Sequence, residues 1–261
     1  MFFLSRRGFK RISNIIYQHI HLSPLDVLFL ISISVYIKNK KYMAKFGVII
    51  DRAHGDNVAG KCSPDAAKGL KGSPYYYKEW EWSSIICKKL ANRLREEGFR
   101  VEFTVNPDDP NEPGLNTRGK ITNKIINDNP DVNWIFISMH SNAVGHIYEW
   151  STATGYSIWT TKGENNSDIL ADCILKRAEE ALPLYKKHIR KNMNSYLKKD
   201  YESNFYVIKA ASCPAVLSEN FFHTTKSDVA WLKSEQGQNT IVDFHVKGIA
   251  DYFKLKFPDE I

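Results

Sequence analysis

The stretch YKEWEWSSIICKKLANRLREEGFRVEFTV, residues 77–105, joins a helix pattern directly to a strand pattern. Its first part places apolar side chains at the spacing of one helix face and closes at Gly98, a residue typical of helix ends. These apolar positions are Trp82, Ile86, Leu90 and Leu94. Its second part, 99–105, has the apolar character of a sheet strand. A helix that leads straight into a strand indicates an α/β protein.

The same alternation continues on both sides of this stretch. Strand patterns occupy 45–51, 99–105, 132–138, 155–160, 205–208 and 214–218, and helix patterns occupy 77–98, 116–128, 166–182 and 236–255. Several strands are almost continuously apolar, as strands covered on both faces are. We therefore expect an α/β fold with three layers, αβα, in which helices flank a twisted, open and mostly parallel sheet of about six strands.

Composition favours one main domain with an N-terminal appendage. The chain has 261 residues, of which 43% are hydrophobic, enough for one good core but too short for three domains. Residues 1–42 hold seven Lys or Arg and one Asp, so most of the net charge of +7 lies there and 43–261 is nearly neutral. A basic surface that binds nucleic acid is therefore not expected.

Residues 1–42 resemble an export signal or an anchor. A basic start precedes the apolar stretch PLDVLFLISISVYI (24–37), and basic residues follow it. This stretch is shorter than the roughly 20 residues that span a bilayer, and it fits the centre of a signal peptide better. Met43, just before the first strand, is an alternative start. We expect contact with a membrane only through 1–42, and little contribution from this segment to the functional site.

Three strand patterns end on side chains that can bind a metal ion or move a proton. IIDRAHGD delivers His54, WIFISMHSN delivers His140, and CPAVLSENFF carries Glu219. Strands of an open α/β sheet place such groups at their carboxyl ends, facing a shared crevice. We therefore expect His54 and His140 to hold one metal ion.

The helix at 77–98 offers a third ligand. A catalytic zinc ion takes about three protein ligands of the His, Asp or Glu type and keeps one position open. Glu79 lies one turn before Trp82 on the core face, whereas Glu81 is rotated away by about 100° per residue. Glu79 is thus the better ligand. A carboxylate in a first turn also has a purely structural role, because it interacts favourably with the helix dipole.

In this order, DRAHGD, KEWEW, SMHSN and PAVLSENFF resemble the zinc-dependent N-acetylmuramoyl-L-alanine amidases, which cut peptidoglycan. That family has an Asp-x-Gly-His-Gly-like turn, a Glu that opens the next helix, a Ser-x-His-x-Asn strand end and a Pro-Ala-x-Leu-x-Glu segment. The resemblance covers about residues 45–253. Arg52, Ala53 and Asp56 depart from the Pro and Gly usual in the first motif, which changes the shape of the turn but removes no ligand.

The resemblance implies a set of roles and a reaction. Zn²⁺ would be held by His54, Glu79 and His140, and Glu219 would be the catalytic residue. The implied activity of 43–261, as the amidase domain, is hydrolysis of the amide between N-acetylmuramic acid and L-alanine of the stem peptide. The alternatives are a zinc peptidase that acts within the stem peptide and a non-catalytic wall-binding regulator, which would be marked by loss of one of these residues.

The resemblance also implies a partner and a location. The partner is peptidoglycan, and we expect a monomer. The expected location is the cell envelope, periplasmic or extracellular, or the cytoplasm until lysis if the enzyme comes from a phage. The sequence does not separate an autolysin from an endolysin.

A second group of residues has weaker patterns. Asp51 and Asn142 are candidates to orient the metal-binding histidines. The alternative for Asp51 is that it simply ends its strand. Arg118 is a candidate contact for a carboxylate of the stem peptide or, alternatively, a solvated surface residue. His223 stands out only because it follows Glu219 closely. Three tryptophans are candidates for stacking on sugar rings or for the core: Trp80, Trp150 and Trp159.

Overall fold

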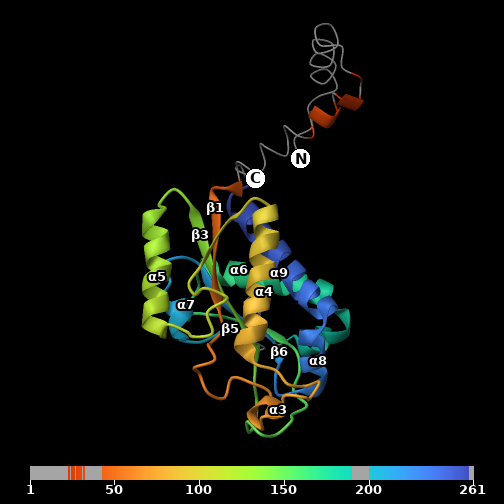
Figure 1. Cartoon of the computed structure of the whole chain (residues 1–261). Helices are drawn as coiled ribbons and strands as arrows, with labels where there is room; N and C mark the ends of the chain where they lie inside the picture. Colours follow the sequence, from red (N-terminus) through yellow and green to blue (C-terminus); the bar gives the residue numbers. More distant parts are fainter. Residues whose placement is uncertain are drawn as a thin grey trace. The chain divides into compact units, whose positions relative to one another are not determined.

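The computed structural model describes residues 43–189 and 200–258, together with scattered residues between 23 and 32 (Figure 1). The chain forms two units, 1–42 and 43–261. The predicted signal or anchor falls mainly outside the described residues. Among the residues that are described, no helix has both the length and the apolar character needed to cross a bilayer.

A six-stranded sheet lies at the centre of 43–261, in the order β2-β1-β3-β6-β4-β5. The strands are β1 (Phe46–Arg52), β2 (Arg100–Phe103), β3 (Asn133–Asn142), β4 (Tyr156–Thr160), β5 (Tyr201–Glu202) and β6 (Ala215–Phe222). The first four strands of the order are parallel to one another, whereas β4 is antiparallel to β6 and parallel to β5. The predicted mostly parallel sheet is confirmed.

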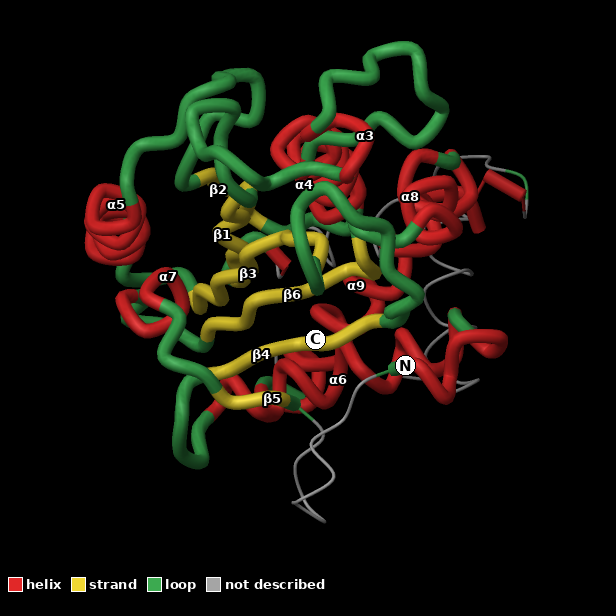
Figure 2. The backbone as a smooth tube through the Cα atoms, turned by 90° about the horizontal axis from the view of Figure 1, so that it is seen from below, coloured by secondary structure: helices red, strands yellow, loops and turns green. Residues whose placement is uncertain are grey.

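Helices cover both faces of this sheet. They are α3 (Pro64–Ala67), α4 (Glu79–Glu96), α5 (Leu115–Asp128), α6 (Asn166–Ala181), the 3₁₀ helix η1 (Pro183–His188), α7 (Tyr206–Ala210), α8 (Lys226–Lys233) and α9 (Glu235–Lys256). Figure 2 shows α5 and α7 beside one face, and α4, α6, α8 and α9 beside the other. Each side has its own apolar cluster. The three-layer αβα architecture is therefore confirmed.

Strand β1 explains why the strands are continuously apolar. Val48 and Ile50 belong to the cluster under α4 and α9, whereas Ile49 belongs to the cluster under α5 and α7. All three side chains are fully buried. Because both faces of the strand are covered by helices, neither face is polar.

The strand order brings together the ends of β1, β3 and β6. The chain runs from β1 through α4 to β2 at the sheet edge, and then through α5 to β3 on the other side of β1. In open α/β sheets, the point where the order reverses opens a crevice at the carboxyl ends of the strands. His54 follows β1, and His140 and Glu219 lie in β3 and β6, so the fold places all three at this end.

The predicted strand at 205–208 is wrong. Helix α7 occupies this place, and the sixth strand is the short β5 just before it. Val207 and Ile208 are buried in the same cluster as Trp134 and Phe136 of β3. The apolar run is one face of a helix packed on the sheet, and it is too short for its spacing to separate a helix from a strand. Helix α8 was also missed by the sequence patterns.

Gly248 allows α6 and α9 to pack closely. A Cβ atom at this position would lie 2.6 Å from the Cα atom of Ile174 in α6. Alanine has the better helix propensity, but a backbone atom cannot move aside as a side chain can. We expect Gly248→Ala to lower the free energy of unfolding by about 1–3 kcal/mol, measured by urea denaturation. A variant as stable as the unaltered chain would contradict this close approach.

Candidate active site

The side chains of His54, Glu79 and His140 meet at the carboxyl end of the sheet. His54 follows β1, Glu79 is the first residue of α4, and His140 lies near the end of β3. Each offers one ligand atom, and these atoms all lie within 4.8 Å of one another. The three side chains can therefore bind a single metal ion.

The carboxylate of Glu79 lies between the two imidazoles. Its Oε1 atom is 3.1 Å from Nδ1 of His140, and its Oε2 atom is 3.8 Å from Nε2 of His54. The two imidazole rings meet edge to face, with centroids 5.0 Å apart. Burial raises the pKa of Glu79, but the hydrogen bond and charge of His140 outweigh this effect and lower the pKa overall. Glu79 is therefore ionised at neutral pH.

The phase of α4 turns Glu79 inward. Glu79 is buried, whereas Glu81 is exposed. The backbone N–H of Glu79 donates to the carbonyl of Lys61 at 3.0 Å, and its Oε1 atom accepts from the N–H of Ser141 at 3.1 Å. Glu79 therefore does more than balance the helix dipole: its carboxylate reaches across to β3.

The turn that carries His54 is held by α4. His54 has a φ of 42°, in the left-handed region that non-glycine residues seldom adopt. The N–H of Ala53 donates to Oγ of Ser83 at 2.9 Å, and that hydroxyl donates to the carbonyl of Met139 at 2.7 Å. One serine of α4 thus ties the turn after β1 to strand β3.

Glu219 lies beside His140. The two residues are paired in register between β3 and β6. The Oε2 atom of Glu219 is buried and has no hydrogen-bond partner in the described part of the chain. The pKa of Glu219 is raised to about 7, mainly by burial. The charge of His140 lowers this pKa, and the charge of Glu79 raises it. Such a carboxyl group can both take up and release a proton near neutral pH.

His223 is a site residue that the sequence patterns did not find. Its side chain is 2% exposed, and its Nδ1 atom lies 3.9 Å from Oε2 of Glu79 and 3.1 Å from Oγ of Ser141. The ring of Tyr77 stacks on it with centroids 5.9 Å apart, and the Tyr77 hydroxyl donates to Ser141. His223 and Tyr77 thus hold Ser141, whose N–H binds Glu79. The closeness of His223 to Glu219 in the sequence was the only signal for His223.

Arg118 lies inside the protein. Its side chain is 2% exposed, and its guanidinium group donates to Oδ2 of Asp51 at 3.0 Å and to the carboxylate of Glu112. It is not a solvated surface arginine, and its charge is paired with carboxylates of the protein itself. Asp51 in turn accepts a hydrogen bond from Ser138. The side-chain oxygen of Asn142 accepts a hydrogen bond from the backbone N–H of the next residue, Ala143.

The three tryptophans make contacts within the protein. Trp150 donates to Asp65 at 3.2 Å, and Trp159 stacks on Tyr201 with centroids 4.7 Å apart. Trp80 donates to Asp56 at 3.0 Å. The core interpretation fits Trp159, which packs against the cluster under α5 and α7.

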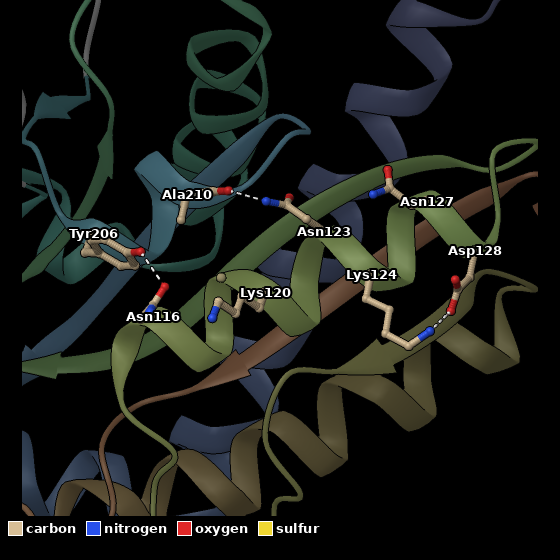
Figure 3. Close-up of a pocket in the computed structure, with 9 residues that line it drawn as sticks. Asn116, Lys120, Asn123, Lys124, Asn127, Asp128, Tyr206 and Ala210 are labelled. Carbon is tan, nitrogen blue, oxygen red and sulfur yellow. Dashed lines mark hydrogen bonds and ion pairs between the residues drawn. The ribbon is translucent and has the colours of Figure 1, made fainter.

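A separate groove lies between α5 and α7 (Figure 3). Its Asn123 side chain donates to the carbonyl of Ala210 at 2.8 Å and accepts from the N–H of Ser212. The hydroxyl of Tyr206 donates to Asn116 at 3.1 Å. These hydrogen bonds hold α7 against α5, so the groups that form them are bound to partners within the protein.

His245 is buried beneath the strand that carries Glu219. Its Nδ1 atom donates to the carbonyl of Ile241 at 2.7 Å, and its Nε2 atom lies 2.8 Å from the hydroxyl of Ser218. Burial lowers the pKa of His245 from 6.5 to about 4. Below pH 6.5, His245 therefore binds a proton in the unfolded chain but not in the folded chain. The free energy of unfolding falls as the pH falls from 6.5 towards 4.

We expect His245 to account for a loss of about 2 kcal/mol of unfolding free energy between pH 6.5 and 5. Urea denaturation at several pH values measures this loss. Because glutamine does not titrate, His245→Gln should lose less stability than the unaltered chain over the same range. Equal pH slopes for the two proteins would contradict a buried neutral imidazole.

Known proteins resemble this chain in sequence over most of its length. Residues 48–251 match the family model of N-acetylmuramoyl-L-alanine amidase. An endolysin of Bacillus phage SPP1 is 28% identical over 211 residues, which cover 80% of this chain and 66% of that protein. An uncharacterized cell wall amidase of Bacillus anthracis is 26% identical over 226 residues, covering 84% of this chain and 38% of that protein. The chain thus spans less than two thirds of the length of either relative.

Solved structures show the same fold. An N-acetylmuramoyl-L-alanine amidase from Clostridium difficile 630 superimposes with a TM-score of 0.61 and 26% identity, covering 81% of this chain and 98% of that one. The amidase Ami1 from Mycobacterium smegmatis gives 0.63 with 18% identity, covering 82% and 99%. The family match extends over most of the chain and includes every residue of the site. The chain therefore belongs to the N-acetylmuramoyl-L-alanine amidase family.

Proposed function

We propose that this chain is a zinc-dependent enzyme that hydrolyses the amide bond between N-acetylmuramic acid and L-alanine of the stem peptide in peptidoglycan. The observation that carries the proposal is the convergence of His54, Glu79 and His140 beside Glu219, whose buried Oε2 atom has no partner in the described part of the chain. Membership of the family supplies the substrate class.

The three side chains fit a divalent cation. Zinc in catalytic sites binds histidine nitrogens and carboxylate oxygens and keeps a position open. Ser138 donates its single hydroxyl hydrogen to Asp51. In the contact between Nε2 of His140 and Oγ of Ser138, at 3.0 Å, the imidazole nitrogen is therefore the donor and the hydroxyl oxygen the acceptor. In the absence of a metal ion, a proton on Nδ1 of His140 makes the hydrogen bond to Oε1 of Glu79 at 3.1 Å. A divalent cation bound by both atoms would take the place of this proton.

The protein's own groups carry the proton transfers. When bound, zinc would polarise the scissile carbonyl and lower the pKa of a water molecule. Glu219 is the group that takes the proton of the attacking water and gives it to the nitrogen of the leaving L-alanine. Burial raises the pKa of this carboxyl group, which suits both directions of transfer. Asn220 donates to the carbonyl of His140 at 3.0 Å and so fixes the two strand ends together.

We also propose which part of the chain is the catalytic domain and where it acts. Residues 43–261 form the amidase domain, which acts as a monomer on peptidoglycan. The phage endolysin and the cell wall amidase among the relatives support a place of action at the cell wall. That place is the cell envelope for a cellular enzyme. A phage enzyme would stay in the cytoplasm until lysis.

Digestion of purified peptidoglycan by the full chain, followed by mass spectrometry of the products, tests the proposal. An amidase releases stem peptides that begin with a free L-alanine amine and leaves glycan strands with free lactyl groups. A peptidase that acts within the stem would instead leave L-alanine on the lactyl group. Binding to the wall without release of peptides would indicate a regulator. Either of these two results would contradict the proposal.

A further inference from the structure

Two series of contacts start at the metal-binding histidines and end on one guanidinium group. In the first series, Nε2 of His140 lies 3.0 Å from Oγ of Ser138, and this hydroxyl donates to Oδ2 of Asp51 at 2.6 Å. The same Oδ2 atom accepts from NH1 of Arg118 at 3.0 Å. The nitrogen involved is the one that faces away from Glu79.

The second series starts at His54. Its Nδ1 atom lies 3.9 Å from Oε2 of Glu112, while its Nε2 atom faces Glu79. The same Oε2 atom of Glu112 accepts from NH2 of Arg118. For each histidine, then, one nitrogen faces Glu79 and the other faces a group that is bound, directly or through Asp51, to Arg118.

Arg118 is built into the protein at this point. Its side chain is 2% exposed, and NH1 also donates to the backbone carbonyl of Arg52, two residues before His54, at 2.9 Å. The Asp51 carboxylate is fully buried and accepts a further bond from Thr104. A planar guanidinium group presents its N–H donors in a fixed fork, so it sets the relative positions of the two carboxylates that it binds.

We infer that Arg118 is a positioning residue that orients both metal-binding histidines at once, His140 through Asp51 and Ser138, and His54 through Glu112. This inference rests on the proposed function, because it needs a metal ion at His54, Glu79 and His140. In this role, the guanidinium group of Arg118 determines which nitrogen of each histidine faces the metal ion. Partners of this kind typically change metal affinity by about 10–100-fold.

A buried ion pair can also be only structural, and the variants must separate the two roles. Ser138→Ala breaks the series to His140, and Glu112→Gln weakens the series to His54, while Arg118 stays in place. Arg118→Lys keeps the positive charge but loses the fork. Arg177→Gln is the control, because Arg177 pairs with Asp251 between α6 and α9, with contacts of 2.6 and 3.0 Å, and contacts no residue of the site.

The measurement is the affinity of the full-length chain for Zn²⁺, by competition with a chromogenic chelator. We expect Ser138→Ala and Glu112→Gln each to weaken binding by about tenfold, and Arg118→Lys by about 10–100-fold. In a chain that already carries Ser138→Ala and Glu112→Gln, adding Arg118→Lys should cause no further loss. Such non-additivity is expected only if Arg118 acts through these two residues. Arg177→Gln should bind Zn²⁺ as the unaltered chain does.

Unchanged Zn²⁺ affinity in a folded Arg118→Lys variant would overturn the inference, as would a full additional loss in the doubly altered background. If Arg118→Lys does not fold, unchanged affinity in both single variants overturns it. Failure of the unaltered chain to bind Zn²⁺ overturns the proposed metal centre and this inference together. If the chain binds Zn²⁺ and the variants behave as expected but peptidoglycan is not cleaved, the inference stands and the proposed function fails.

Discussion

Replacing Glu219 with glutamine is expected to lower kcat for stem-peptide release by about 10²–10⁴-fold. The amide has nearly the same size as the carboxyl group but cannot take a proton from water. The altered Oε2 atom has no hydrogen-bond partner in the described part of the chain, so no hydrogen bond of that atom is lost. Peptide release from purified peptidoglycan, followed over time by mass spectrometry, measures the effect.

The Glu219→Gln experiment has a matched control on helix α4. Glu81 is an exposed glutamate of that helix, and Glu81→Gln should leave the rate unchanged. Zinc content should stay at the level of the unaltered chain in both variants, because neither residue is among the proposed ligands. Full activity of Glu219→Gln would contradict its role in proton transfer.

Removing the metal ion is expected to abolish peptide release. A metal ion contributes several kcal/mol of transition-state stabilisation, so its loss corresponds to about 10³-fold or more in rate. A chelator and His140→Ala should each have this effect. Added Zn²⁺ should restore activity after chelation, but not in His140→Ala, where one of the three ligands is missing.

The control for His140→Ala is His146→Ala. His146 is exposed, and its ring lies near Tyr148 rather than near the site. Its loss should change neither zinc content nor activity. Undiminished activity in an excess of chelator, with no metal left in the protein, would reject the zinc mechanism.

The sequence was informative where side-chain patterns are local. The apolar spacing in α4 predicted both the helix and the inward position of Glu79, because neighbouring turns of one helix share a face. The strand patterns around His54 and His140 located them at the sheet's carboxyl end, since that placement follows from parallel strand order. At 205–208 the apolar pattern predicted a strand where the chain forms a helix, because a short apolar run fits a buried helix face as well as a strand.

The supporting contacts of the site are tertiary: Asp51 and Arg118 were candidates whose pairing was not predicted, and Glu112 and Ser138 were not predicted at all. Glu112 lies in a loop rich in Pro, Asp and Asn, and nothing in that composition indicates that its carboxylate reaches Arg118. Ser138 is one small polar residue within a buried strand, and its partner Asp51 comes from a neighbouring strand. Arg118 is separated from Asp51 by 67 residues, so their pairing is decided only when α5 packs against the sheet.

The proposed chemistry depends on one zinc ion held by His54, Glu79 and His140 next to Glu219. Crystals of the full chain grown with Zn²⁺, with diffraction data collected at the zinc absorption edge, locate this ion. We expect one strong anomalous peak bound by these three side chains, with the carboxyl group of Glu219 facing it. A peak bound by other residues, or no peak at this place in crystals whose protein contains zinc, would contradict it.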